Sequence, residues 1–144
     1  VDFPRAWLEK ESYDFSFSGL KSAVINYSHN VKQRGEQLNA EAVARGFQQS
    51  VVDVLIERTV RAAKAYDVKQ VIAAGGVSAN QGLRHALQKE LAEANIEFSV
   101  PPIQYCTDNA AMIGAAGYEM YRKGCRSDWK MNGEPGKALT SWSN

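Results

Sequence analysis

The sequence lacks the features that mark several common classes of protein. It has only two cysteines and two histidines among 144 residues, and the cysteines form no C-x-x-C pair. So few cysteines do not make a disulfide scaffold, and they favour a reducing, cytoplasmic setting. No run of 18 apolar residues occurs, so we expect no transmembrane helix and no membrane partner. The first residues also lack the pattern of a secretory signal peptide.

A strong charge of either sign is also missing. The chain has 17 Lys and Arg residues against 16 Asp and Glu residues, a formal net charge of +1 at pH 7. Nucleic-acid-binding domains usually have a larger basic excess, although a local patch can still hold phosphates. Acids are mixed among the basic residues, so we interpret these as solvated faces unless the fold gathers them. They are Lys32, Arg34, Arg58, Arg61, Lys64, Arg122, Lys123 and Arg126.

What the chain does have is the composition of one globular domain. Hydrophobic residues make up 44% and charged residues 23%, close to the average for such domains. Gln70–Ala74 is a short apolar run, residues 79–93 carry leucines on one helical face, and residues 96–100 form a second short run of strand type. This order predicts a parallel strand pair covered on both faces, with a crossover helix between the strands. The fold class is therefore α/β.

The first half of the chain shows further elements. Polar and aromatic residues alternate over 14–18, which indicates a half-buried strand that Gly19 ends. A short helix is predicted over 20–27, followed by a polar connector. Asn39 is expected to cap the longest helix, which runs to about Tyr66. Its apolar stripe is expected to comprise Val43, Phe47, Val51, Leu55 and Val60.

One candidate site is the turn after the first apolar run, Gly75–Asn80. Two adjacent glycines let the backbone adopt unusual dihedral angles and let a ligand approach closely. The helix start that follows offers N–H groups suited to phosphate, and the amide of Asn80 can both donate to and accept from a ribose or base. The alternative is a tight strand-to-helix turn without a ligand, because the spacing matches neither G-x-G-x-x-G nor a Walker loop.

A second candidate is Asp108, at the start of a helix predicted from there to about Arg122 with Thr107 as its cap. An acid at this place is typical of a first-turn residue that interacts with the helix dipole. The alternative is a metal-ligating carboxylate, which would need partners because one carboxylate does not make a metal site. Neither His29 nor His85 shows ligand spacing to it, and Cys106 has no local base that would make it a nucleophile.

Three strings together resemble one known family. They are DFSFSGLK at 14–21, GGVSAN at 75–80 and TDNAAMI at 107–113. Their order and spacing are similar to those in the C-terminal part of the TsaD family, the tRNA threonylcarbamoyladenosine transferases related to the catalytic KEOPS subunit. The resemblance implies one lobe of an actin/sugar-kinase/Hsp70-like (ASKHA) fold, with a mixed sheet packed with helices. This lobe would span residues 1–124. The resemblance does not extend to residues 125–144, whose polar composition with Gly and Pro predicts a tail that packs on the lobe or is partly disordered, with Trp129 and Trp142 as docking points.

The resemblance also implies an activity. The family transfers a threonylcarbamoyl group from threonylcarbamoyl-AMP to N6 of the adenosine 3′ of the anticodon in tRNAs that read ANN codons. Gly75 and Gly76 would lie at the nucleotide, Asn80 would bind its adenylate part, and Asp108 would be a ligand of one divalent metal, iron or zinc. The implied partners are tRNA, a TsaB-like inactive paralogue, a TsaE-like P-loop ATPase and a TsaC-like enzyme that makes the adenylate.

The chain departs from the family in one respect. The family's H-x-x-x-H metal pair and its first phosphate-binding segment belong to an N-terminal half that this sequence does not contain. We therefore expect this chain alone to be inactive. Two other functions stay open: a nucleotide-binding module without transferase activity, and a scaffold that docks a paralogue. No general base is assigned.

Overall fold

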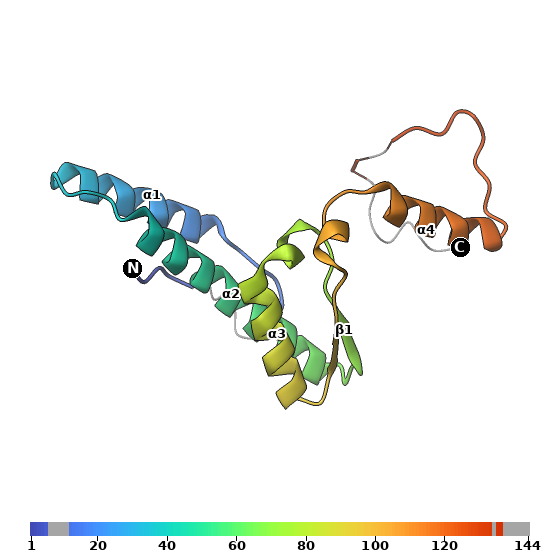
Figure 1. Ribbon diagram of the computed structural model, residues 1–144, viewed down its shortest axis with the longest axis horizontal. Helices are drawn as coiled ribbons and strands as arrows, with labels where there is room; N and C mark the ends of the chain where they lie inside the picture. Colours follow the sequence, from blue (N-terminus) through green and yellow to red (C-terminus); the bar gives the residue numbers. More distant parts are fainter. Residues whose placement is uncertain (6–11, 134, 137–144) are drawn as a thin grey trace. The chain divides into compact units, whose positions relative to one another are not determined.

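The computed structural model describes residues 1–5, 12–133 and 135–136 (Figure 1). The chain divides into two compact units, Val1–Thr107 and Asp108–Asn144. Most regular elements belong to the first unit. In order they are α1 (Ser18–Gln33), α2 (Ala40–Ala65), β1 (Gln70–Ile72), the 3-10 helix η1 (Gly76–Ala79), α3 (Gln81–Glu93), β2 (Glu97–Ser99) and the 3-10 helix η2 (Ile103–Tyr105). In the described part of the second unit the regular element is the helix α4 (Ala110–Arg122).

The core of the first unit lies between α2 and α3, which pack side by side (Figure 1). The face of α3 that carries Leu83, Leu87 and Leu91 is buried, as the leucine spacing predicts. It meets Val52 and Val60 of α2 in one apolar cluster. Burial of a leucine side chain stabilises a fold by about 1.5–3 kcal/mol, so this face holds α3 in place.

The sheet is a parallel pair, β1 beside β2, with α3 as the connection between them. Val71 lies opposite Phe98 in the register. This confirms the predicted strand–helix–strand unit and the α/β class. The predicted burial on both faces is wrong, because Ile72 is 70% exposed. The mixed sheet that the resemblance implies is also not seen in the described residues, whose sheet has two parallel strands.

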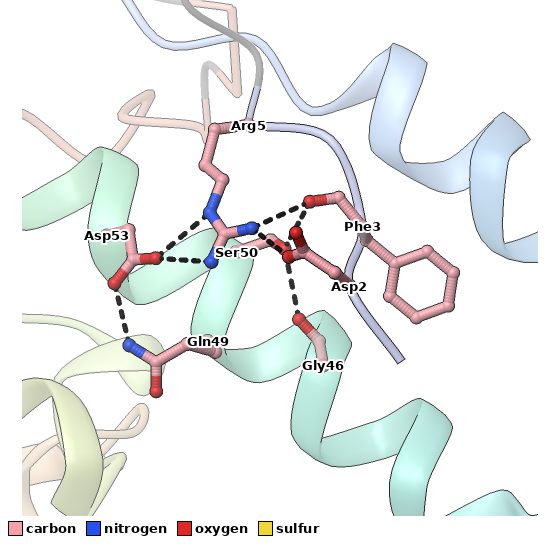
Figure 2. A network of polar contacts seen from close by, with 7 residues as sticks. All are labelled: Asp2, Phe3, Arg5, Gly46, Gln49, Ser50 and Asp53. Atoms are coloured by element: carbon pink, nitrogen blue, oxygen red, sulfur yellow. Dashed lines mark hydrogen bonds and ion pairs between the residues drawn. The ribbon is translucent and has the colours of Figure 1, made fainter.

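The N-terminal segment is fastened to α2 by polar contacts (Figure 2). Arg5 donates to Asp53 from Nε at 3.0 Å and from Nη2 at 2.8 Å, and it also pairs with Asp2. The hydroxyl of Ser50 lies 3.0 Å from the carbonyl oxygen of Phe3. A side chain at Gly46 would collide with the carbonyl of Val1, so a glycine inside this helix permits the close approach.

Two predictions about the first half of the chain are wrong. Residues 14–17 form no strand, because the carbonyl of Phe17 already accepts the first helical hydrogen bond of α1, from Lys21 at 3.1 Å. The helix is also longer than the predicted 20–27. It ends in a Schellman motif, in which Gly35 adopts φ 71° and its N–H donates to Lys32, while Glu36 donates to Val31.

The longest helix forms as predicted, but its buried face differs from the predicted stripe. Asn39 caps α2 by accepting the N–H of Ala42 at 2.9 Å, which confirms the predicted start. Phe47 of the predicted stripe is 43% exposed, whereas Val54 and Arg58 are buried. The reason is that α2 contacts α1 as well as α3, so it buries side chains in more than one direction.

The helix of the second unit, α4, has no buried residue. The predicted division into residues 1–124 and a tail over 125–144 stays a prediction. Residue 134 and residues 137–144, including Trp142, lie outside the described residues. Within the described part of the chain, none of the helices combines the length and the hydropathy of a transmembrane span.

Candidate nucleotide-binding loop and metal ligand

The candidate loop connects β1 to α3 and is shaped by its own hydrogen bonds. Gly75 accepts at its carbonyl oxygen from Ser78, both from the backbone N–H at 3.0 Å and from the hydroxyl at 2.6 Å. Ser78 is buried, whereas Gly75, Gly76 and Val77 are exposed. The loop therefore presents backbone at its surface while its inner side is fixed.

The two glycines differ in what the fold requires of them. Gly75 has φ 84° and ψ 170°, a backbone region that is essentially confined to glycine. Gly76 begins η1 and has no positive φ, and a Cβ atom placed on it would meet no atom within 4 Å. The backbone conformation of the turn thus requires a glycine at position 75. Position 76 has no such requirement, and its glycine leaves open space beside an exposed backbone.

Asn80 has two structural contacts. Its Oδ1 accepts the N–H of Leu83 at 3.0 Å and caps α3, and its Nδ2 donates to Oε1 of Gln48 at 2.9 Å. Because Asn80 is the cap, α3 begins at Gln81, after the 3-10 helix η1 that starts at Gly76. The expected role of Asn80 toward an adenylate stays a prediction, and such a ligand would replace the contact to Gln48.

Arg84 is a residue that the sequence pattern did not single out. Its Nε donates to the carbonyl of Ser78 at 2.5 Å, and its Nη2 lies 2.8 Å from the carbonyl of Pro101 and 2.9 Å from Sγ of Cys106. Cys106 is buried. Arg84 thus ties the candidate loop to the segment that follows β2. Its place one turn into α3 gave no signal of these contacts.

An apolar groove of about 670 Å³ lies beside the same loop. Its lining includes Phe47, Val51 and Leu55 of α2 and Val77 and Asn80 of the loop, together with Phe17 and Leu83. Phe47 and Val77 are exposed there. The exposed position of Phe47, unexpected from the helical pattern, is thus a wall of this groove.

The structure gives Asp108 a different local setting from the predicted one. It precedes α4, and the cap is Asn109, whose Oδ1 accepts the N–H of Met112 at 3.0 Å. The predictions that Thr107 caps the helix and that Asp108 lies in its first turn are therefore wrong. Asp108 is exposed, and in the described part of the chain its carboxylate makes no hydrogen bond or ion pair. A side chain that the helix does not use is available to a ligand.

The described residues do not complete a metal centre. Among them, no three His, Cys, Asp or Glu side chains gather as a set that could hold a metal ion. A catalytic metal site normally has about three protein ligands, so Asp108 alone does not fit one. The structure brings Gly75, Gly76 and Asn80 together in one loop of the first unit, and Asp108 belongs to the second unit.

Comparison with known proteins gives matches along the whole chain. A model of the family described as TsaD, tRNA N6-adenosine threonylcarbamoyltransferase, matches residues 1–115. The protein of that name from Bacillus subtilis (strain 168) is 57% identical over 145 residues, which cover 100% of this chain and 42% of the relative. The one from Geobacillus thermodenitrificans (strain NG80-2) is 59% identical over 140 residues, covering 96% of this chain and 41% of the relative.

The chain spans about two fifths of the length of these curated relatives. The family match nevertheless covers most of its residues, including the candidate loop and Asp108. The chain belongs to the TsaD family of tRNA N6-adenosine threonylcarbamoyltransferases.

Proposed function

We propose that this chain is part of an enzyme that moves a threonylcarbamoyl group from threonylcarbamoyl-AMP to N6 of the adenosine 3′ of the anticodon, in tRNAs that read ANN codons. The observation that carries the proposal is the identity of 57% over the whole chain with a relative named as such a transferase. In the reaction, the N6 amine attacks the carbonyl carbon of the carbamoyl group. A C–N bond forms, the C–O bond to the phosphate breaks, AMP leaves, and N6 loses a proton.

In this proposal the loop at Gly75 and Gly76 holds the adenylate. The open space beside Gly76 and its exposed backbone support this role, since a phosphate needs close approach to backbone N–H groups. Asn80 would bind the adenosine part through its Nδ2 group. That group now donates to Gln48 in a contact of exposed side chains, and exchange of such a hydrogen bond for another costs little. Holding both reactants in place would supply much of the rate.

Asp108 is proposed as one ligand of a divalent metal, iron or zinc. Its support is an exposed carboxylate that α4 does not use as a cap. The described residues do not complete the site, so the other ligands would come from the part of the full-length protein that lies outside this chain. The chain by itself is then inactive.

The remaining parts of the proposal concern the fold and the partners. The exposed face of β1, where Ile72 is 70% exposed, supports a lobe of ASKHA type in which further strands and side chains cover this short sheet. The proposed partners are tRNA, a TsaB-like paralogue, a TsaE-like ATPase and a TsaC-like enzyme that supplies the adenylate. The cytoplasm is the proposed site of action, and both cysteines are free thiols, as a reducing compartment requires.

A chimera tests the proposal. The aligned part of the Bacillus subtilis relative is replaced by this chain, and transfer to tRNA is measured with purified partners and threonylcarbamoyl-AMP. Asn80→Asp keeps an oxygen that caps α3 but removes the amide donor, so we expect a KM for the adenylate raised about tenfold with unchanged stability. Lys89→Gln, at an exposed site on α3, is the matched control. A folded chimera that binds adenylate but transfers nothing would favour the nucleotide-binding module instead.

A further inference from the structure

Two segments of the first unit leave the carboxyl ends of its parallel strands. Residues 75–80 follow β1, and residues 101–106 follow β2 and lead to Asp108 in the sequence. Just beyond β1, the N–H of Ala73 still donates to the carbonyl of Ser99 at 3.0 Å, and after this hydrogen bond each segment enters a 3-10 helix. Ligand sites of α/β sheets lie outside such strand ends, so the placement of these two segments relative to each other bears on the site.

The side chain of Arg84 bridges the two segments. Its Nε donates to the carbonyl of Ser78 at 2.5 Å, and its Nη2 lies 2.8 Å from the carbonyl of Pro101 and 2.9 Å from Sγ of Cys106. The acceptors in these contacts are two carbonyl oxygens and a sulfur atom, none of them a carboxylate. The planar guanidinium presents its donors in a fixed fork, so this one side chain sets the spacing of two stretches of backbone.

Both ends of this bridge are fixed by further contacts. Ser78 is buried, and its N–H and hydroxyl both donate to the carbonyl of Gly75, at 3.0 Å and 2.6 Å. Cys106 is also buried, and its N–H donates to the carbonyl of Ile103 at 3.1 Å. Because neither end is loose, a displacement of one segment is passed through Arg84 to the other.

The helix that carries Arg84 is held in place by other residues. Leu83, Leu87 and Leu91 are buried, and they belong to the apolar cluster that α3 shares with α2. Arg84 lies in the first turn of α3, and its contacts reach away from the helix to the loop and to the segment after β2. These contacts therefore act mainly on the placement of the two segments.

We propose that Arg84 is a positioning residue of the transfer reaction, which sets the place of residues 75–80 relative to the segment that leads to Asp108. The inference rests on the proposed function, which assigns the adenylate to that loop and a metal to Asp108. A misplacement of about 1 Å at a reacting centre can lower a rate about a hundredfold. Loss of the bridge should therefore lower the rate of transfer more than the affinity for the adenylate, because the loop keeps its own hydrogen bonds.

Kinetics of the chimera test this role. Arg84→Met should lower kcat at least about tenfold and change the KM for the adenylate less than about threefold, whereas Asn80→Asp should change the KM. Arg84→Lys keeps the charge but not the fork, so its kcat should stay within about threefold of that of Arg84→Met. Leu91→Ala weakens the packing of α3 away from the loop and is the control, with an unchanged kcat per folded molecule.

A second measurement needs no transfer. The reaction of Cys106 with a thiol reagent is followed in the folded chimera by mass spectrometry of the peptide that carries it. Gly75→Ala disturbs the loop and should speed this reaction about fivefold when Arg84 is present, but less than about twofold in the Arg84→Met background, because the bridge is gone. Leu91→Ala should speed the reaction equally in both backgrounds, since it acts on the packing of the helix and not through the bridge.

A raised KM with an unchanged kcat in Arg84→Met would overturn the proposal, and so would full activity of Arg84→Lys, because Arg84 would then act on the adenylate through its charge. Equal acceleration by Gly75→Ala in the two backgrounds would overturn it as well. If the unsubstituted chimera folds but transfers nothing, the proposed function is wrong. The labelling experiment then decides by itself whether Arg84 couples the loop to the segment before Asp108.

Discussion

Gly75 and Gly76 are neighbours for which the structure predicts opposite effects of the same substitution. Gly75→Ala places a Cβ atom on a residue with φ 84° and ψ 170°. Only glycine adopts this region readily, so the substitution should lower the free energy of unfolding by about 1–3 kcal/mol. Gly76→Ala meets no atom within 4 Å and no positive φ. At this position the alanine lowers the conformational entropy of the unfolded chain, so the free energy of unfolding should stay unchanged or rise by up to about 1 kcal/mol.

Urea unfolding of the 144-residue chain, followed by circular dichroism, measures both variants. With a slope of about 2 kcal/mol per molar urea, Gly75→Ala should lower the midpoint by roughly 0.5–1.5 M, and Gly76→Ala should not lower it. In the chimera, Gly76→Ala should still raise the KM for the adenylate, because its methyl group occupies the space proposed for the ligand. Equal midpoints for the two variants would refute the assignment of the turn to Gly75 alone.

Three other changes test the packing and the polar contacts. Arg84→Met removes the hydrogen bonds of Arg84 to Ser78 and Cys106, so it should lower the free energy of unfolding by about 1–3 kcal/mol. It should also speed the reaction of the buried Cys106 with a thiol reagent, and an unchanged labelling rate would contradict this. Leu91→Ala, at a fully buried position, should cost about 3–5 kcal/mol in urea unfolding, and a cost below about 1 kcal/mol would place the core elsewhere. The pKa of Arg5 is raised above its ordinary value, first by its hydrogen bond with Asp53 and then by Asp2. Because this pKa is raised on folding, the protonated guanidinium stabilises the fold at every pH below its ordinary pKa, and this stabilisation is lost only in strong alkali. Asp53→Asn should therefore lower the free energy of unfolding equally at about pH 6 and about pH 9. The loss should be smaller in high salt.

The parts of the fold that the sequence predicted are those set by local spacing. Leucines four residues apart, with mostly polar residues between them over a stretch this long, are typical of one helical face, and Leu83, Leu87 and Leu91 are buried together. The cap at Asn39 needs only an amide oxygen three residues before a free N–H, so it too could be found from the sequence. The parallel pair followed from a helix between two short apolar runs.

The predictions that failed concern places where two local structures compete for the same residues, or where contacts join residues far apart in the sequence. Thr107 and Asn109 are both good cap residues, and Asn109, with φ −154° and ψ 153°, has the extended backbone of a cap and accepts the N–H of Met112. Alternation over 14–18 fits a strand, but a strand needs a partner for its backbone groups, and the carbonyl of Phe17 bonds within α1 instead. The tether at Arg84 joins residues up to 22 positions apart, which no periodic pattern records.

For the candidate site, the sequence placed Gly75, Gly76 and Asn80 in one turn, and the structure has them there. The cap that Asn80 forms on α3 is a local signal that the sequence analysis did not use. The contact of Asn80 with Gln48, 32 residues away, could not be predicted, because it depends on how α2 packs. Asp108 was a candidate because of its place at a predicted helix start, and the family resemblance assigned it to a metal; that role stays a prediction.

The amount of threonylcarbamoyladenosine in cellular tRNA tests directly whether this chain is part of a working transferase. The chimera becomes the only copy of the transferase in Bacillus subtilis, tRNA is digested to nucleosides, and the modified adenosine is measured by mass spectrometry. We expect the chimera to restore the modification, and Asp108→Ala to remove it while the protein stays folded and abundant. A stable, abundant chimera that leaves the adenosine unmodified would contradict the claim that this chain is part of a working threonylcarbamoyltransferase.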